Sequence, residues 1–257
     1  MRQVTVHGHF GEWFQGRIGA SGPVALVTLV CTPLVVTAPS KDEFPFTADQ
    51  LAGFARAIGV KALPGARRNF PLGIGAGGST ATLVAAARSA GFAGPPDRLA
   101  RACLAVEGAT DPLMYDAPDS LLWASRSGEV LRRMPPPPRA AILGGLWGAP
   151  VRTDAKDVAF EDVSDLARDW AAATEAGDLP RVAAIASESA RRCIARRGPD
   201  DPMNDLARDL GALGTVRAHT GSARGLVFAP GQIPPRAAAA MNEAGLEDIL
   251  GFETGGT

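Results

Sequence analysis

The chain has 257 residues, 46% of them hydrophobic, and a formal net charge of −1 at pH 7. This length suits one large domain or two small domains that share a cleft. The near-neutral charge, with a single tyrosine and no interleaving of basic and aromatic residues, argues against binding to nucleic acid or to an anionic membrane. The composition favours a folded protein with a substantial core.

The three cysteines are widely spaced and odd in number, so they indicate neither a disulfide framework nor a zinc site. We expect Cys31, Cys103 and Cys193 to be buried thiols. The first residues lack the apolar core of a signal peptide. The longest apolar run, residues 24–36, is about half a membrane span and contains a proline. We therefore expect a cytoplasmic protein.

In the first half of the chain, valine-rich stretches favour strands and regular apolar spacing favours helices. Thr47 is a good N-cap for the first helix. The patterns predict strands over 3–7 and 24–37, helices over 48–58, 80–90 and 97–106, and short strands within 113–134 that turn at Ser127 and Gly128.

Four consecutive prolines, Pro135–Pro138, mark the clearest break in composition, because proline cannot join a helix or a central strand. We interpret them as a stiff connector between two halves, 1–135 and 136–257, with a proline-rich recognition motif as the alternative. The second half mixes helices and strands without a repeated βα unit, which favours an α+β fold. Its patterns predict a strand over 139–145, helices over 162–176 and 179–197, strands over 213–219 and 226–229, a helix over 235–244 and a strand over 246–252.

The most informative segment is the run PLGIGAGGSTA, residues 71–81, which precedes an apolar, helix-like stretch. Glycine has no Cβ, so such a loop can bring backbone N–H groups within reach of an anion. A helix that begins at its end adds unpaired N–H groups and a partial positive charge. Together these features predict a phosphate cradle. The hydroxyls of Ser79 and Thr80 are suited to holding Mg²⁺ against the phosphates.

This glycine-rich loop is not a Walker P-loop, because it contains no lysine. Its glycines satisfy the G-x-G-x-x-G pattern of dinucleotide-binding proteins, but residues 69–71 before them do not indicate a parallel strand. A glycine-rich turn that only caps a helix remains the alternative at this point.

Two further motifs accompany the glycine-rich loop. They are Gly11-Glu12-x-x-Gln15-Gly16 near the start and Ala218-His219-Thr220-Gly221-Ser222 near the end. In this order and spacing, the three motifs resemble the GHMP kinase superfamily, which includes galactokinase, homoserine kinase and mevalonate kinase. The central motif of that family is P-x-x-x-G-L-x-S-S-A. This chain matches it at Pro71, Gly75 and Ser79, and departs from it at Ala76 and Gly78.

Within the superfamily the chain is most similar to the L-threonine kinases of cobalamin synthesis, and the likeness spans nearly the whole chain. Those kinases carry G-E-x-x-Q-G, S-S-T-A-D, E-P-T-D and A-H-S-G-T segments. The corresponding residues here are 11–16, 78–82, 107–111 and 218–222. Two departures lie near the expected substrate site. The cysteine- and proline-rich lead-in is absent, and Thr82 stands in place of the aspartate. Kinase chemistry is therefore better supported than threonine as the acceptor.

The resemblance implies a two-lobed α+β fold, with an N-terminal lobe like the second domain of ribosomal protein S5 and a ferredoxin-like C-terminal lobe. It implies an ATP- and Mg²⁺-dependent kinase that phosphorylates an amino acid, L-threonine first, to O-phospho-L-threonine for the cobalamin side chain. The alternatives are a GHMP kinase for homoserine, serine or an amino alcohol, and a catalytically inactive nucleotide-binding relative. The expected partners are ATP and a hydroxy amino acid, without nucleic acid or membrane; a homodimer stays an open alternative.

Phosphoryl transfer requires bound phosphates, neutralised charge and an acceptor hydroxyl in line. The resemblance assigns Mg²⁺ to Ser79, for which simple helix capping is the alternative role. Glu107 is a backup for the carboxylate role of Asp111 given below, or instead a second Mg²⁺ ligand. It assigns ATP binding to the loop residues Pro71, Gly73, Gly75, Ala76, Gly77, Gly78, Ser79 and Thr80.

Asp111 is the candidate for accepting the proton of the acceptor hydroxyl, with a turn before Pro112 as the alternative. Glu12, supported by Gln15, is the candidate for binding a substrate amino group, with a surface turn as the alternative. Arg224 is a candidate for offsetting phosphate charge, unless it lies on the surface. The third motif supplies further candidates for substrate binding, which are His219, Thr220 and Gly221.

His7 and His9 are two residues apart in the first predicted strand, so we expect both side chains on one side of it. They would form half a metal site, and no third ligand is evident. A partly buried polar pair is the favoured interpretation.

Overall fold

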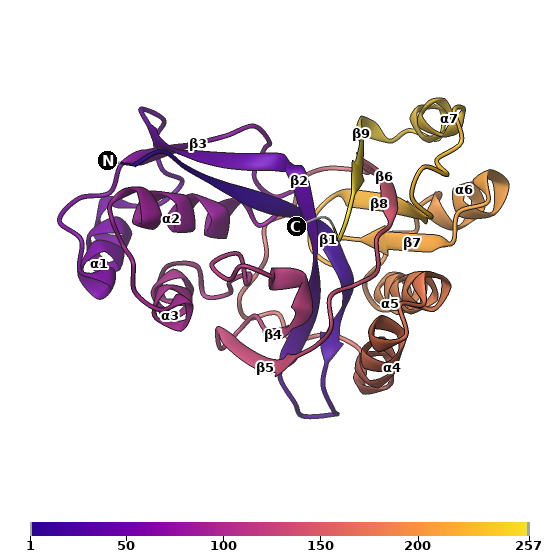
Figure 1. Cartoon of the computed structure of the whole chain (residues 1–257), viewed down its shortest axis with the longest axis horizontal. Coiled ribbons are helices and arrows are strands. Elements are labelled where there is room, and N and C mark those ends of the chain that lie inside the picture. The colour runs from indigo at the N-terminus through magenta and orange to yellow at the C-terminus, as the bar shows by residue number, and fades with distance from the viewer. Residues whose placement is uncertain (1, 256–257) are drawn as a thin grey trace.

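The computed structural model describes residues 2–255 and has one sheet that runs through both halves of the chain (Figure 1). The strand order along the sheet is β5-β4-β2-β1-β7-β8-β6-β9, and β3 pairs with β2 beside this path. The named strands pair antiparallel. At its centre lies a long hairpin formed by β1 (Val4–Arg17) and β2 (Val24–Ser40). The expected α+β class is confirmed.

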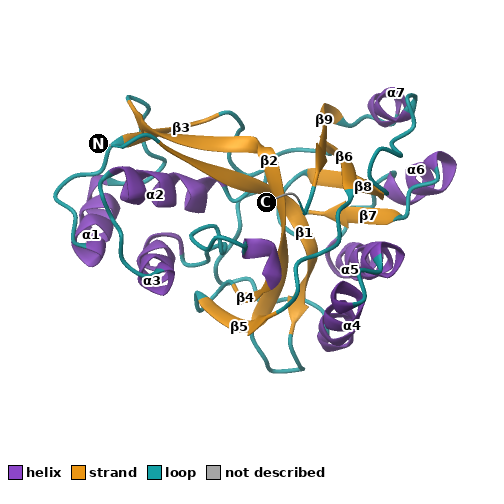
Figure 2. Ribbon diagram, in the orientation of Figure 1, coloured by secondary structure: helices purple, strands orange, loops and turns teal. Residues whose placement is uncertain are grey.

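In the first half, three helices lie to one side of the central hairpin (Figure 2). Helix α2 packs on β1 and β2, and α1 packs on α3. Helix α1 begins as predicted, because the hydroxyl of Thr47 accepts a hydrogen bond from the Gln50 N–H and the Gln50 side chain accepts one from the Thr47 N–H. The elements are α1 (Ala48–Ile58), β3 (Gly65–Arg68), α2 (Gly78–Ser89), α3 (Pro96–Glu107), the 3-10 turn η1 (Pro118–Ser120), β4 (Leu121–Ala124) and β5 (Glu129–Arg133).

In the second half, helices cover both faces of a four-stranded antiparallel sheet. Side chains alternate along β6, so that Ile142 joins the main core while Ala141 and Leu143 join a smaller core under α6 and α7. Helix α5 packs on β1 and β7, and α4 packs on α5. The elements are β6 (Ala141–Leu146), α4 (Ser164–Glu175), α5 (Leu179–Arg197), α6 (Met203–Leu210), β7 (Gly214–Arg217), β8 (Ala223–Phe228), α7 (Ala237–Glu243) and β9 (Glu247–Glu253).

Helix α6 has no counterpart among the elements predicted from the sequence. It is amphipathic, and its buried residues are Met203, Leu206 and Leu210. Its eight residues make about two turns, which is too short for a periodic signal to stand out.

Strand β1 is longer and less regular than predicted. It continues through the Gly11–Gly16 motif, and its pairing with β2 shifts register between His7 and Gly8. Such a bulge changes which face the following side chains point to. His7 is exposed whereas His9 is buried, so the expectation that both lie on one side of the strand was wrong.

The two halves of the sheet meet where β1 pairs with β7 through a single residue pair, Glu12 with Arg217. Beside this seam, Asp201 Oδ2 lies 2.8 Å from Arg224 Nε and 3.5 Å from Arg217 Nη1, and all three side chains are buried. We call these three residues the buried arginine cluster. Arg224 is therefore neither on the surface nor at a phosphate site, because β8 turns its side chain inward to Asp201.

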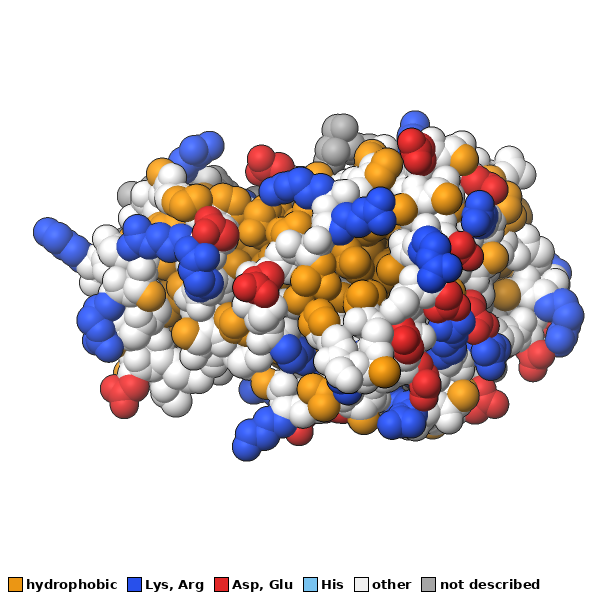
Figure 3. Space-filling view, turned by 90° about the horizontal axis from the view of Figure 1, so that it is seen from below, with side chains coloured by type: hydrophobic (Ala, Val, Ile, Leu, Met, Phe, Trp, Pro, Cys, Tyr) orange, Lys and Arg blue, Asp and Glu red, His pale blue; other side chains and the backbone are white. Residues whose placement is uncertain are grey.

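Seen from below, the molecule gathers hydrophobic side chains in the centre of one face and charged side chains of both signs to the right (Figure 3). On helices α4 and α5, Arg192 contacts Asp165 and Glu188 in an ion-pair network. The three cysteines are buried and free, as expected. Within residues 2–255, no helix combines the length and the apolar character needed to span a bilayer.

Candidate active site

The central hairpin, the glycine-rich loop and the loop after β6 enclose a cavity of about 360 Å³, which lies in the size range of small-molecule sites. Most of the residues singled out from the sequence line it. They are Glu12, Gln15, Pro71, Gly73, Gly75, Ala76, Gly77, Gly78, Ser79, Thr80, Glu107, Asp111 and Thr220. His219 and Gly221 lie behind this wall. Gly221 packs against the glycine-rich loop, where an added Cβ would lie 2.4 Å from the Gly75 nitrogen.

The glycine-rich loop has one packed side and one side that lines the cavity. Gly73, Gly75 and Gly77 all have positive φ, between 64° and 84°, which favours glycine. A Cβ on Gly75 would lie 2.2 Å from the Cβ of Ala218, and a Cβ on Gly77 would lie 2.6 Å from the ring of His9. The glycines therefore let the loop pack closely against β1 and the third motif while the other side stays at the cavity.

Helix α2 begins at the cavity with Gly77 as its N-cap, and no side chain caps it. The Ala81 N–H is bonded to the Gly77 carbonyl oxygen at 2.8 Å. The N–H groups of the preceding residues, Gly78, Ser79 and Thr80, belong to the first turn, where a helix supplies no acceptor and carries partial positive charge. Ser79 is not the N-cap, so the capping role considered for it was wrong.

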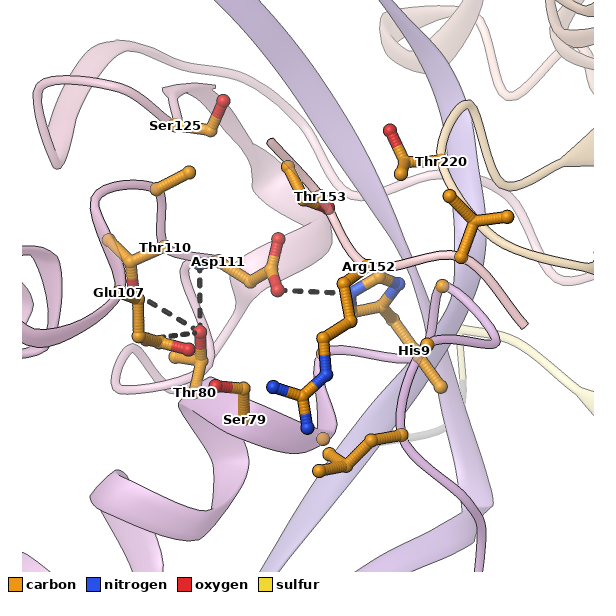
Figure 4. Close-up of a pocket in the computed structure, with 18 of the residues that line it drawn as sticks. His9, Ser79, Thr80, Glu107, Thr110, Asp111, Ser125, Arg152, Thr153 and Thr220 are labelled. Carbon is orange, nitrogen blue, oxygen red and sulfur yellow. Dashed lines mark hydrogen bonds and ion pairs between the residues drawn. The ribbon is translucent and has the colours of Figure 1, made fainter. Parts of the chain in front are cut away.

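Thr80 connects helix α2 to the segment that follows α3 (Figure 4). Its hydroxyl donates to Glu107 Oε2 at 2.9 Å, lies 3.2 Å from Thr110 Oγ1 and accepts from the Asp111 N–H at 3.3 Å. Trp123 Nε1 donates to the Thr110 carbonyl oxygen at 2.6 Å, which helps to fix the segment after α3. The buried Thr80 hydroxyl thus contacts the carboxylate of Glu107 and the backbone of Asp111, and so links two of the acidic residues that line the cavity.

Glu107 ends helix α3 and faces Ser79 and Thr80. Burial, aided by the negative charge of Asp111, raises the pKa of Glu107 to about 8, although hydrogen bonds from the hydroxyls of Ser79 and Thr80 lower it. Such a carboxyl releases its proton when a cation binds. A carboxylate beside a hydroxyl supplies the oxygen ligands that Mg²⁺ prefers, and Mg²⁺ commonly uses only one or two protein carboxylates together with phosphates. The donor set therefore fits Mg²⁺.

Among residues 2–255, no group of three or more His, Cys, Asp and Glu side chains has the arrangement of a metal site.

His9 contacts Asp111 across the cavity wall. Its Nε2 lies 3.3 Å from Asp111 Oδ2, and its Nδ1 lies 3.1 Å from the Gly11 carbonyl oxygen. Both partners are acceptors, so the ring must carry a proton on each nitrogen to satisfy them. Burial lowers the pKa of His9, but the charge and hydrogen bond of Asp111, with the charge of Glu12, outweigh it and raise the pKa above its ordinary value. The arrangement therefore favours the protonated, cationic form of His9 beside the carboxylate.

Glu12 lies on β1, lines the cavity and is 6% exposed, so the surface turn considered for it was wrong. Its Oε2 accepts from the His219 N–H at 3.1 Å and lies 3.3 Å from His219 Nδ1. His219 Nε2 in turn lies 3.0 Å from Ser189 Oγ. Burial lowers the pKa of His219, although Glu12 raises it. His219 thus holds Glu12 in place from behind the cavity.

Two arginines line the cavity that the sequence did not single out, Arg126 and Arg152. Arg152 belongs to the loop between β6 and α4, which is docked to the glycine-rich loop because the Val151 N–H donates to the Gly73 carbonyl oxygen at 2.8 Å. Figure 4 shows its guanidinium pointing toward Ser79. Neither arginine lies in a motif, and only the folded chain brings them to the site.

No family model and no curated protein matches the sequence. Solved structures do match over the full length. Mevalonate kinase from Staphylococcus aureus covers 100% of both chains with a TM-score of 0.62 at 15% identity. A protein described as a homoserine kinase from Listeria monocytogenes covers 99% of both chains with a TM-score of 0.62 at 15% identity. Phosphomevalonate kinase from Streptococcus pneumoniae covers 98% of both chains with a TM-score of 0.65 at 10% identity.

The chain has the two-lobed fold of the GHMP kinases. At identities this low, the likeness establishes the fold alone, so activity has to be argued from the cavity. The division of this fold at residues 135 and 136 stays a prediction; the proline run there joins β5 to β6.

Proposed function

We propose that this chain is an ATP-dependent kinase that phosphorylates the hydroxyl group of a small amino acid, with L-threonine as the first candidate acceptor. The observation that carries the proposal is a convergence at one cavity. The start of helix α2, the Ser79 and Glu107 pair and the Asp111 carboxylate all lie on its wall. These are the parts that phosphoryl transfer needs: an anion site, a metal site and a base.

The triphosphate of ATP is assigned to the glycine-rich loop. The first-turn N–H groups of α2, with the helix dipole, attract phosphate oxygens. Arg152 supplies from across the cavity the positive charge that a loop without lysine lacks. Apolar side chains also line the cavity and are suited to contact a planar base; they are those of Pro45, Phe46, Leu72 and Val106.

Ser79 and Glu107 are the residues that would hold Mg²⁺. When bound, Mg²⁺ neutralises phosphate charge during transfer. Thr80 holds the carboxyl of Glu107 toward Ser79 by its 2.9 Å hydrogen bond. The raised pKa of Glu107 supports this assignment, because a carboxyl that stays partly protonated without a cation is one whose surroundings lack a positive partner.

Asp111 is assigned as the base. The acceptor hydroxyl oxygen forms a bond to the γ-phosphorus, the bond from that phosphorus to the β,γ-bridging oxygen breaks, and the hydroxyl proton passes to Asp111 as ADP leaves. The His9 cation, 3.3 Å from Asp111, orients the carboxylate and stabilises its charge before transfer.

The acceptor is assigned to the side of the cavity that contains Glu12, Gln15 and Thr220. None of the hydrogen bonds among residues 2–255 uses Glu12 Oε1, which leaves that oxygen to accept from an ammonium group. L-threonine is preferred because four segments of the sequence resemble the L-threonine kinases, and its product, O-phospho-L-threonine, would serve cobalamin side-chain synthesis. Homoserine is the second candidate, since the same fold is found in a protein described as a homoserine kinase.

The test is an assay of ADP release with ATP, Mg²⁺ and a panel of L-threonine, L-serine, L-homoserine and their amino alcohols. We expect turnover that depends on Mg²⁺ and stops with a chelator. Mass spectrometry of the product identifies the phosphorylated acceptor. Absence of ADP release above background with every acceptor would contradict the proposal. ATP binding without turnover would instead favour an inactive relative.

A further inference from the structure

Arg126 lines the cavity without a carboxylate partner. It follows β4, is half-buried, and among residues 2–255 makes no ion pair within 4.0 Å. Nη1 donates to Ser125 Oγ at 2.8 Å and Nη2 to the carbonyl oxygen of Asp157 at 3.3 Å, both of them neutral acceptors. A guanidinium has five N–H donors. Two are used, so three lack a protein acceptor within the described residues, and one of these, on Nε, is buried.

The neighbouring shielded arginines differ from Arg126 in this respect. Arg197 pairs with Asp157, and the buried arginine cluster shares Asp201. Burying a guanidinium without a counter-charge is costly. Arg126 is the arginine that carries this cost, and it lines the cavity.

The direction of Arg126 is fixed by packing. Its guanidinium carbon lies 5.5 Å from the centre of the Phe160 ring, and that of Arg197 lies 4.5 Å from the same ring. Both cations stack on one aromatic residue, a favourable contact that holds them in place. The arginine is therefore preorganised rather than free to swing into solvent.

The charges around Arg126 define what the cavity can bind. Burial lowers the pKa of Arg126, and the more distant charges of Asp111, Asp157 and Glu12 oppose this effect. The cavity thus presents a cation at the β4 end and the Glu12 carboxylate on β1. A ligand that complements both carries a negative group and a positive group.

We propose, on the basis of the kinase function above, that Arg126 binds the carboxylate of the acceptor and that the acceptor must be a hydroxy acid. Charge-assisted hydrogen bonds from a guanidinium to a carboxylate are strong and directional. The amino alcohols left open by the sequence are thereby excluded as good acceptors. With Glu12 on the ammonium, the two groups together select an α-amino acid.

The experiment compares each amino acid with its amide, in which an uncharged carboxamide replaces the carboxylate. Values of kcat/KM are measured for L-threonine and L-threoninamide, and likewise for serine and homoserine, with the wild type and Arg126→Gln. We expect the wild type to prefer the acid about 100-fold, and Arg126→Gln to lose about 100-fold on the acid but less than about threefold on the amide. Arg126→Lys should recover part of the loss.

The matched control is Arg132→Gln, which removes the same charge from an exposed position on β5. It should leave both values unchanged. Because Arg126 makes no ion pair, Arg126→Gln should also keep the Tm within about 3 °C of wild type. A purely structural role for Arg126 would instead lower the Tm and reduce turnover of acid and amide alike.

Two outcomes overturn the proposal. Equal losses on acid and amide, with a raised KM for ATP, would assign Arg126 to the nucleotide phosphates. A wild type that turns over the amide as well as the acid, or better, would refute carboxylate binding by Arg126 while leaving a kinase in place.

If no acceptor is turned over, the proposed function fails, and calorimetric binding of L-threonine and L-threoninamide decides the inference separately. Selective binding of the acid that Arg126→Gln abolishes supports it. Equal binding, or no binding of either compound, refutes it.

Discussion

Two groups of buried charge flank β1, and they are built differently. In the buried arginine cluster, Asp201 pairs with both arginines, and no member lines the cavity. At the cavity, by contrast, Glu107 has a raised pKa and Arg126 has no counter-charge. Both arrangements bury charge, but only the second leaves charge for something else to pair with. Incomplete pairing therefore separates the candidate active site from a structural network.

The largest expected effect is on stability, in the buried arginine cluster. Asp201→Asn removes the carboxylate that two buried guanidinium groups share, and breaking a buried ion pair costs about 3 kcal/mol or more. We expect urea unfolding to show this loss, with kcat per folded molecule nearly unchanged. If Asp201→Asn is as stable as wild type, the buried arginine cluster does not stabilise the fold as proposed.

The same substitution at the cavity should have the reverse effect. Asp111→Asn removes the proposed base and should lower kcat about 100- to 1,000-fold. The unfolding midpoint should change less than in Asp201→Asn, because His9 can lose its proton when the carboxylate is removed, whereas an arginine cannot. Asp116→Asn, at an exposed position outside the cavity lining, is the control. If Asp111→Asn retains wild-type turnover, another group accepts the proton.

Ser79→Ala removes one proposed Mg²⁺ ligand but no helix cap. We expect kcat to fall at least tenfold, about 1.4 kcal/mol, with partial rescue at high Mg²⁺. Ser127→Ala, in the exposed turn between β4 and β5, should have no effect. A loss that high Mg²⁺ does not relieve would argue against a metal ligand.

Glu107 predicts a pH dependence of metal binding. With a pKa of about 8, it is mostly protonated at pH 7 and mostly ionised at pH 9, so Mg²⁺ affinity should rise about tenfold over that interval. Without Mg²⁺, the free energy of unfolding should fall as the pH rises from about 5 to 8, because the folded state holds the proton more tightly than the unfolded chain does.

Isothermal titration with Mg²⁺ across this range tests the affinity, and urea unfolding of the metal-free protein tests the stability, each with Glu107→Gln and the exposed control Glu129→Gln. A Glu107→Gln protein that keeps the same pH dependence would show that another group is responsible.

The smallest expected effect is at Arg152, because its side chain is exposed and charge there is screened. Arg152→Gln should raise the KM for ATP about fivefold and leave the KM for the acceptor unchanged. The loss should shrink as the salt concentration rises. If Arg152→Gln raises only the KM for the acceptor, Arg152 would be assigned to the acceptor and Arg126 to the nucleotide.

Much of the fold was predictable because its signals are local. The capping box at Thr47 and the apolar spacing of α1 gave that helix its observed bounds. The glycine-rich loop and Asp111 were likewise found from motifs. The α6 helix was missed because its pattern is only eight residues long. The different exposure of His7 and His9 was missed because it results from a bulge in β1 that depends on the pairing with β2.

The positively charged side of the site could not be predicted. His9, Arg126 and Arg152 come from a strand, a turn and a loop that are far apart in sequence. Their proximity results from long-range packing, and none belongs to a pattern with a fixed spacing. The sequence motifs identified the acidic residues and the anion-binding loop, whereas the balancing cations emerge only once the chain is folded.

The seam between β1 and β7 gives Glu12 a double role. Its backbone forms the one residue pair between these strands, while its side chain reaches both the cavity and His219. A ligand that binds this carboxylate would therefore contact the residue that joins the two halves of the sheet. We expect occupancy of the proposed acceptor pocket to be coupled through Glu12 to the relative orientation of the two lobes.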